Sequence, residues 1–205
     1  GLGHVGEALI GYLRERGVAR IVGADVDPAR AARIVQAYPD LDLDLRVVER
    51  GDNSVLESLV DVLAPCATGG VLNEDTIPTI KAPIVCGAAN NQLGDPSTDD
   101  ARLAERGILY LPDFLVNRMG IVHCADEQYG SLPGDPRIER HLGDQWDNSV
   151  YNLSLTVLDR ARETGKTPAR IALDLAEERS FEKHPIWGHR GADIIENLAW
   201  SGWAG

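Results

Sequence analysis

The chain has 205 residues, with 32 acidic and 20 basic side chains and a formal net charge of −12. A surface this acidic repels phosphate backbones and anionic lipid headgroups, so we expect neither nucleic acid nor a membrane as a partner. Hydrophobic residues make up 43% and charged residues 25% of the chain, which indicates a folded globular protein and excludes a disordered one.

Three cysteines, Cys66, Cys86 and Cys124, are widely spaced and include no C-x-x-C pair. An odd number at these spacings disfavours a disulfide framework and a zinc ribbon. We therefore expect buried thiols, no metal site and a reducing, cytoplasmic compartment.

The first six residues, GLGHVG, match the glycine fingerprint of a dinucleotide-binding turn, G-x-G-x-x-G. In such a turn the glycines permit a tight bend, let the backbone approach a pyrophosphate, and let the next helix pack against a sheet. The helix expected over residues 4–16 would present free N–H groups and the positive end of its dipole to the phosphates. By itself the motif has low specificity, because glycine-rich turns are common.

Five apolar runs follow within the first 130 residues, and helical patterns lie between several of them. Runs this rich in Val, Ile and Leu are typical of parallel strands covered on both faces. We expect helices over residues 27–38 and, shortened or kinked by Pro78, over residues 74–81. The strands are expected at residues 19–25, 45–49, 59–65, 82–88 and 107–112. This alternation predicts an α/β fold for residues 1–130, a Rossmann-type doubly wound parallel sheet that lacks its first strand.

A Pro/Gly break at residues 131–136 ends the strand pattern, and helical periodicity follows. Thr167 and Pro168 are typical of an N-cap and the first residue of a helix. Residues 131–205 are therefore expected to form a C-terminal helical tail that packs on the sheet domain and on a partner surface.

The apolar run over residues 19–25 ends in Asp25, nineteen positions after Gly6. A carboxylate there accepts hydrogen bonds from both adenine-ribose hydroxyls and repels a 2′-phosphate, which favours NAD over NADP. Asp27 is the competing candidate, although it precedes Pro28 and is more typical of an N-cap. Arg30 could bind a 2′-phosphate instead, and a fold of this type without a nucleotide is the remaining alternative.

Small and amide residues follow two later apolar runs, in PCATGG (65–70) and GAANN (87–91). At the carboxyl ends of parallel strands they would border a ligand crevice, and their small size would let a flat nicotinamide ring lie against the backbone. Asn90 and Asn91 offer amide groups to a polar ligand, although an Asn pair is also ordinary loop chemistry.

Together, APCATGG (64–70), GAANNQL (87–93) and PDFLVN…ADE (112–127) resemble the C-terminal, dinucleotide-binding part of the glutamate/leucine/phenylalanine/valine dehydrogenase family. The resemblance covers nearly the whole chain and is greatest to the leucine and phenylalanine branch. It implies NAD-dependent oxidative deamination of an L-amino acid to its 2-oxo acid and ammonia, and the reverse amination.

The resemblance also implies a set of site residues. Those that would bind the cofactor are Gly1, Leu2, Gly3, His4, Val5, Gly6, Asp25, Val26, Ala67, Thr68, Ala88, Ala89 and Asn90. Those that would bind the substrate are Asn90, Asn117, Ile121 and Cys124. Asn117 would begin the helix that carries the substrate pocket. Uncharged Ile121 and Cys124 favour an aliphatic amino acid over glutamate, although plain helix core is an equal alternative for both.

One departure from the family pattern leaves the substrate open. After Asn117 this branch usually has Ala-Gly-Gly, whereas this chain has Arg118, Met119 and Gly120. Either the two large side chains point away from the pocket, or they narrow it and add a cation.

The catalytic lysines and aspartate of the family lie on a separate N-terminal domain, which we expect this chain to lack and its tail to contact. Lys81, Lys166 and Lys183 stand in no cleft-like context, so we assign them to solvent and name no catalytic residue. The resemblance predicts the cofactor half of a homo-oligomeric enzyme, inactive alone. The alternative is a non-catalytic NAD/NADH-sensing module, which would share the turn and Asp25 but would have no need of GAANNQL.

Overall fold

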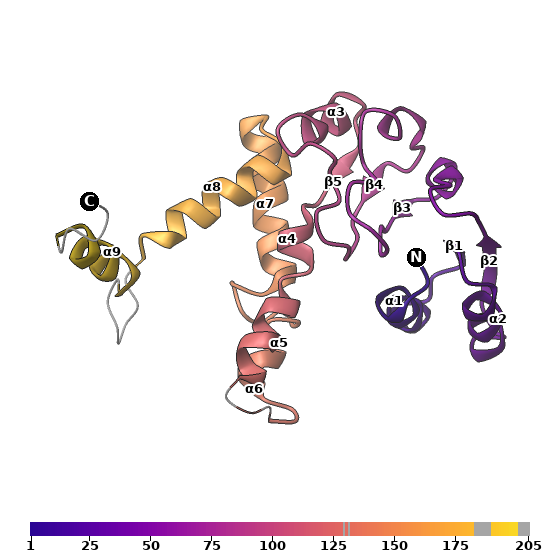
Figure 1. Cartoon of the computed structure of the whole chain (residues 1–205), viewed down its shortest axis with the longest axis horizontal. Helices are drawn as coiled ribbons and strands as arrows, with labels where there is room; N and C mark the ends of the chain where they lie inside the picture. The colour runs from indigo at the N-terminus through magenta and orange to yellow at the C-terminus, as the bar shows by residue number, and fades with distance from the viewer. Residues whose placement is uncertain (129, 131, 183–189, 201–205) are drawn as a thin grey trace.

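The computed structural model describes residues 1–128, 130, 132–182 and 190–200, and these form an α/β fold whose strands are parallel (Figure 1). One sheet pairs β1 (Arg20–Asp25) with β2 (Asp42–Val47). A second sheet holds three short strands in the order β3 (Val62–Leu63), β4 (Ile84–Val85) and β5 (Leu109–Tyr110). The prediction of an α/β fold with parallel strands is confirmed, and in the described residues the strands form two sheets, since no backbone pairing joins β1 to β3.

Nine helices and two 3-10 turns accompany the strands in the described part of the chain. They are α1 (His4–Glu15), α2 (Pro28–Ala37), η1 (Ser54–Glu57), η2 (Ile77–Thr79), α3 (Asp99–Glu105), α4 (Asp113–Val116), α5 (Met119–Glu127), α6 (Pro136–Glu139), α7 (Val150–Thr164), α8 (Pro168–Ser180) and α9 (Arg190–Trp200). The helices predicted over residues 4–16 and 27–38 are confirmed as α1 and α2. The segment over residues 74–81 holds only the short turn η2, in agreement with the limit set by Pro78.

Local capping explains where two of these helices begin. The Asp27 carboxylate accepts the Ala29 N–H at 2.9 Å, so Asp27 is the N-cap of α2. The Thr167 hydroxyl accepts the Arg170 N–H at 3.2 Å, with Pro168 as the first residue of α8. Both predicted N-caps are therefore confirmed.

Strand lengths differ from the prediction. The runs at 59–65, 82–88 and 107–112 each supply only a two-residue strand. Conversely, β2 begins at Asp42, three residues before the predicted start, and alternates Asp and Leu. A strand ends where its neighbour stops pairing with it, and the composition of a run does not contain that information.

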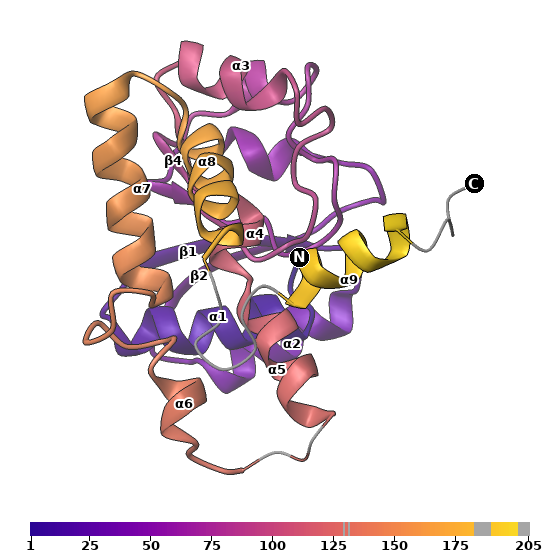
Figure 2. The same ribbon diagram turned by 90° about the vertical axis from the view of Figure 1, so that its left-hand side faces the viewer.

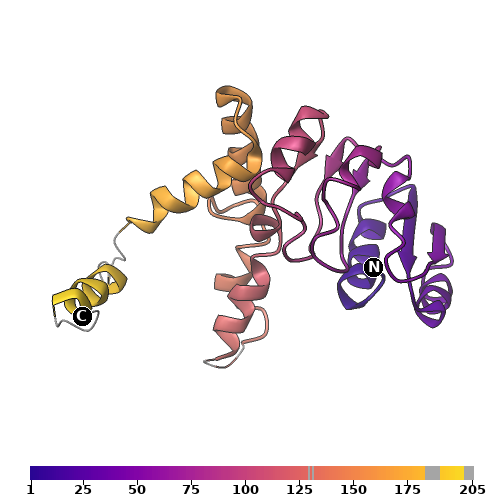
Figure 3. The same cartoon turned by 45° about the horizontal axis from the view of Figure 1, so that its top comes forward.

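Three apolar clusters of the described residues stabilise the fold. The first, around Ile34, packs α1 and α2 on the first sheet. The second, around Val85, packs η2 and α3 on the second sheet. The third, around Val157, joins α4, α7 and α8. Figure 2 shows α7 and α8 side by side, and Figure 3 shows α1 and α2 at the opposite end of the molecule from α9.

The tail contacts the apolar cluster of the second sheet and the helix α3. Ala169 of α8 belongs to the cluster around Val85. The Thr167 hydroxyl, besides capping α8, donates to the Asp100 carboxylate of α3 at 2.7 Å. The predicted domain limits, at residues 130 and 131, stay a prediction. None of the described helices combines the length and the apolar character that crossing a bilayer requires.

Replacement of Ile34 tests the first cluster. Ile34 has no exposed surface, whereas its neighbour Val35 on α2 is 50% exposed. We expect Ile34→Ala to lower the free energy of unfolding by about 3 kcal/mol, because it leaves a cavity between α2 and the sheet. Val35→Ala should cost less than about 1 kcal/mol. Urea unfolding of both variants measures this, and equal losses would show that the cluster is not the core described.

Candidate functional site

The turn of residues 1–6 lies at the carboxyl ends of two strands from different sheets. The Leu2 N–H donates to the Asp25 carboxylate, at the end of β1, at 2.7 Å. A Cβ on Gly1 would lie 2.6 Å from the Cβ of Ala67, which follows β3. The turn therefore contacts the carboxyl ends of both sheets, where ligands of open α/β folds bind.

Gly6 permits the close approach of the helix to the turn. A Cβ on Gly6 would lie 2.0 Å from the Gly1 carbonyl oxygen, so no larger residue fits. The first intrahelical bond of α1 runs from the Glu7 N–H to the Gly3 carbonyl at 2.9 Å. The N–H groups of His4, Val5 and Gly6 precede this bond, and such groups at a helix N-terminus favour an anion.

Asp25 is 8% exposed and ionised. Its carboxylate also accepts the Asp27 N–H at 3.0 Å and lies 3.5 Å from the Arg30 guanidinium. Burial raises the pKa of this carboxyl, but the two N–H donors and Arg30 outweigh burial and leave the pKa below its ordinary value. Each oxygen accepts one of the two backbone bonds, and Oδ1 also faces Arg30, so Oδ2 has a lone pair for a further donor.

Arg30 lies between the two acidic candidates. It pairs with Asp27 at 3.4 Å as well as with Asp25, and its Nη1 lies 3.9 Å from the position of a Cβ on Gly3. Asp25 is the acid that faces the turn, because it accepts the Leu2 N–H, whereas Asp27 caps α2.

A cavity of about 1020 Å³ brings together more than half of the residues predicted to bind the cofactor. The predicted residues that line it are Gly1, Leu2, Gly6, Asp25, Val26, Ala67 and Thr68. They come from the turn, the end of β1 and the segment after β3, so positions up to 67 residues apart in sequence share one space.

The loop after β4 approaches this edge from the other side. The Ala89 N–H donates to the Pro65 carbonyl at 2.9 Å, and a Cβ on Gly87 would lie 2.4 Å from the Pro65 nitrogen. Asn117 Nδ2 donates to Asn90 Oδ1 at 2.6 Å and lies 3.4 Å from the Ala88 carbonyl. The structure thus joins Asn90 and Asn117, two predicted substrate-binding residues, into one amide pair.

Residues that sequence reasoning missed hold this loop. The Asp113 carboxylate accepts the Asn91 N–H at 2.7 Å and the Tyr110 hydroxyl at 3.2 Å. Burial raises the pKa of Tyr110, so the hydroxyl stays protonated and donates. Asn91 has a φ of 52°, in the left-handed region, and its carbonyl accepts the Gly70 N–H at 2.7 Å. The position of Asp113 directly after the fifth apolar run was the signal that could have identified it.

The helix predicted to start at Asn117 needs correction. Asn117 is the C-cap of α4, and the following helix, α5, begins at Met119. Two helices meet here because the α4 hydrogen-bonding pattern ends at the Asn117 N–H, which donates to Asp113 at 2.8 Å.

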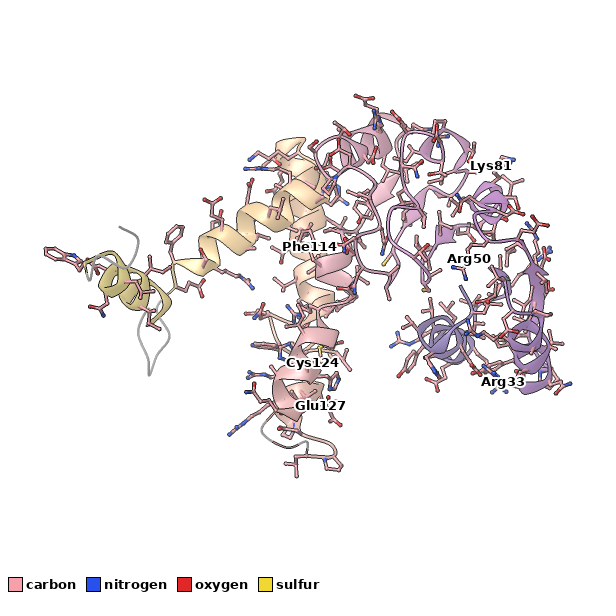
Figure 4. The ribbon with its side chains drawn as sticks, in the orientation of Figure 1. Arg33, Arg50, Lys81, Phe114, Cys124 and Glu127 are labelled. Carbon is pink, nitrogen blue, oxygen red and sulfur yellow. The ribbon has the colours of Figure 1, made fainter. Side chains whose placement is uncertain are left out.

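Ile121 and Cys124 lie on α5 and are exposed, Ile121 by 79%. Cys124 is labelled on this helix in Figure 4. The alternative that they are plain helix core is therefore wrong, and their role in a substrate pocket stays a prediction. Phe114, on α4, is also partly exposed in the same view.

Arg118 contacts the tail. Its guanidinium donates to the Asn148 carbonyl and lies 3.2 Å from His141 Nδ1, in the segment between α6 and α7. Burial, together with the nearby Arg179, lowers the pKa of Arg118. Of the two possibilities left by the sequence, these contacts favour a side chain directed away from the Asn90–Asn117 pair.

Three lysines and three cysteines are the remaining candidates for chemistry in this chain. Lys81 is exposed, Lys166 donates to Asp174 at 2.8 Å, and Lys183 lies outside the described residues. All three cysteines are free thiols, with Cys66 and Cys86 partly buried. The described residues contain no group of His, Cys, Asp or Glu that could hold a metal ion.

The parallel strands, with helices between them, define an α/β protein, and the polar groups gathered at the carboxyl ends of the strands make that edge the candidate ligand site. The chain belongs to the glutamate/leucine/phenylalanine/valine dehydrogenase family, whose sequence model matches residues 26–183.

Relatives of several specificities match to a similar degree. Valine dehydrogenase of Streptomyces coelicolor is 37% identical over 187 residues, which are 90% of this chain and 47% of that protein. Leucine dehydrogenase of Geobacillus stearothermophilus is 36% identical over 180 residues, 87% of this chain and 45% of that protein. The identities do not single out the leucine and phenylalanine branch. The chain spans about half the length of the curated relatives it matches.

The crystal structure of L-tryptophan dehydrogenase from Nostoc punctiforme is similar, with a TM-score of 0.74 and 32% sequence identity. The match covers 87% of this chain and 50% of that one. This similarity supports the α/β fold and the family assignment together.

Replacement of Asn91 tests the loop that carries Asn90. We expect Asn91→Ala to lower the free energy of unfolding by about 1 kcal/mol, because a Cβ without a local polar partner is strained at positive φ. Asn91→Gly should be close to neutral, since glycine adopts this conformation freely. Chemical denaturation compares the two, and a larger loss for Gly than for Ala would contradict the φ assigned to Asn91.

Proposed function

We propose that this chain is the NAD-binding portion of an amino acid dehydrogenase, with a Rossmann-type cofactor site. The reaction is the reversible oxidative deamination of an L-amino acid to its 2-oxo acid and ammonia. The observation that carries the proposal is the Asp25 carboxylate, buried at the end of β1 and hydrogen-bonded to the turn before α1.

The residues present fit a dinucleotide. The tight contact of Gly6 with Gly1 leaves the N–H groups at the start of α1 accessible at the turn, where a pyrophosphate would lie. The remaining lone pair of Asp25 suits an adenosine-ribose hydroxyl, and the charge of this carboxylate disfavours a 2′-phosphate. Bound NAD supplies the hydride acceptor for the oxidation, and Ala67, Thr68, Ala88 and Ala89 would leave space beside its ring.

The substrate proposal rests on the amide pair. Asn90 and Asn117 present a carbonyl and an amide group that could orient an amino-acid head group. An aliphatic side chain is favoured by the relatives named valine and leucine dehydrogenase, and an aromatic one by the relative named L-tryptophan dehydrogenase. We place Ile121 and Cys124 near that side chain.

We extend the proposal to a cytoplasmic homo-oligomer in which the catalytic lysines and aspartate come from another domain. The free thiols support a reducing compartment. The exposed Lys81 and the ion-paired Lys166 support an external source of the catalytic groups.

Cofactor titration tests the role of Asp25. We expect the chain to bind NADH more tightly than NADPH, and Asp25→Asn to weaken NADH binding by roughly 10- to 100-fold, as loss of a charged acceptor implies. The same variant should reduce the preference of the chain for NADH over NADPH. Calorimetry or the fluorescence of the reduced nicotinamide gives both constants.

Asp27→Ala is the matched control for that titration. It removes the cap of α2 and should cost stability while leaving the NADH preference intact. Weak binding in Asp27→Ala with normal binding in Asp25→Asn would assign the ribose to Asp27 instead.

An activity assay tests whether the catalytic groups lie outside this chain. The chain that binds NADH should produce no NADH from NAD with leucine, valine, phenylalanine or tryptophan, because its described lysines lie outside the site. Binding of NADH by the same sample is the control for a folded site. Measurable NAD reduction would place catalytic groups within this chain and overturn that part of the proposal.

A further inference from the structure

The loop of residues 87–91 is attached to α4 at two consecutive positions. Asn90 and Asn91 are both exposed, so burial does not fix the direction of their side chains. The Asn91 N–H donates to the Asp113 carboxylate at 2.7 Å, and Asn90 Oδ1 accepts the Asn117 amide at 2.6 Å. The first residue of α4 and its C-cap therefore hold neighbouring residues of the loop.

The spacing along α4 explains this double attachment. Asp113 and Asn117 are four positions apart, so their side chains lie on the same face of the helix. The Asn117 N–H donates to the Asp113 carbonyl at 2.8 Å and closes that turn. Leu115, between them, is buried in the cluster around Val157, which packs α4 against α7 (Figure 1). The helix thus presents two polar groups to the loop from a packed position.

The two oxygens of the Asp113 carboxylate have separate partners. Oδ2 accepts the Asn91 N–H, and Oδ1 accepts the Tyr110 hydroxyl at 3.2 Å. Tyr110 is buried at the end of β5, so its hydroxyl has a defined position. The bond to Tyr110 therefore directs the other oxygen of Asp113 at the loop.

The first part of the loop is held without Asp113. Gln92 has no exposed surface, and its Nε2 donates to the carbonyls of Gly87 and Ala89 at 2.8 and 3.0 Å. These two bonds fix residues 87–89. Neither of them involves the backbone between residues 90 and 91.

The peptide unit between Asn90 and Asn91 depends on Asp113. Its N–H is the group that Asp113 accepts, and Asn91 has a φ of 52°. The Gly70 N–H donates to the Asn91 carbonyl, which belongs to the next peptide unit. Because a peptide unit is planar and rotates as a whole, a rotation here would redirect the Asn90 side chain at one end of the unit.

We propose that Asp113 is a positioning residue for the nicotinamide end of the bound dinucleotide. It holds the peptide unit between residues 90 and 91 and thereby directs the Asn90 amide at the ring, without touching the ligand itself. The inference rests on the proposed cofactor site. It assigns to Asp113 a role in binding the nicotinamide and none in binding the ADP-ribose part, which lies at the glycine turn and Asp25.

The test compares NADH with ADP-ribose, which lacks the nicotinamide. Calorimetry with the full chain gives both dissociation constants. We expect Asp113→Ala to weaken NADH binding about fivefold, the loss that one misplaced hydrogen bond implies, and ADP-ribose binding by less than about twofold. Retained ADP-ribose binding shows that the variant is folded. Equal losses for both ligands, or no loss for either, would overturn the proposal.

Asp113→Asn tests the hydrogen bond to Asn91. Its amide oxygen can still accept the Asn91 N–H while its nitrogen donates to Tyr110, so NADH binding should return to within about twofold of the original chain. A loss as large as that of Asp113→Ala would contradict the positioning bond. Asp135→Ala is the matched control, since Asp135 accepts the Arg137 N–H at 2.8 Å at the start of α6. It should leave both constants unchanged, and a selective loss of NADH binding there would count against the role of Asp113.

A double-mutant cycle tests whether Asp113 acts through Asn90. In the Asn90→Ala background, Asp113→Ala should weaken NADH binding by less than about twofold further, because the amide that it positions is absent. A further loss as large as in the original chain would overturn the proposal.

The two ligands also separate this inference from the proposed function. If the original chain bound neither ligand, the cofactor site would be wrong and the role of Asp113 with it. If it bound ADP-ribose as tightly as NADH, the cofactor site would stand, but the role of Asp113 would be overturned.

Discussion

The hydrogen bond from the Leu2 N–H to the Asp25 carboxylate fixes the glycine turn on the end of β1. A buried carboxylate is costly unless donors compensate for its lost hydration, and Leu2, Asp27 and Arg30 supply that compensation. The same bond sets the direction of α1, whose N-terminus then points at the strand ends. The contact between Gly1 and Ala67 also positions the turn beside the segment that follows β3 of the second sheet.

Local chemistry made the helices and their caps predictable. Asp27 before Pro28 and Thr167 before Pro168 determine helix starts within a few residues, and the structure has both. Strand length and sheet continuity depend on which edges find partners far away in the sequence. The run of apolar residues around β3 does not indicate that this strand pairs over only two residues.

Some of the site residues are likewise predictable from the sequence, and others are not. The turn and Asp25 follow from a spacing that has a mechanical reason, and the structure gathers them around one cavity. Asp113 and Tyr110 were missed because they act on the backbone of Asn91, and a supporting contact has no spacing of its own. The direction of Arg118 and the exposure of Ile121 depend on how α5 sits beside the tail, which the composition of that segment does not determine.

Adjacent residues 117 and 118 face different parts of the molecule. Asn117 donates a hydrogen bond to the Asn90 amide, while Arg118 contacts Asn148 and His141. The peptide unit between residues 117 and 118 therefore connects two sets of contacts. One set involves the Asn90 amide, and the other involves the segment between α6 and α7. Small residues at positions 118 and 119, which the leucine and phenylalanine branch usually has, would not form the contacts with the segment between α6 and α7. In this chain the contacts of these two residues connect the segment between α6 and α7 to the amide pair without including a residue of either sheet.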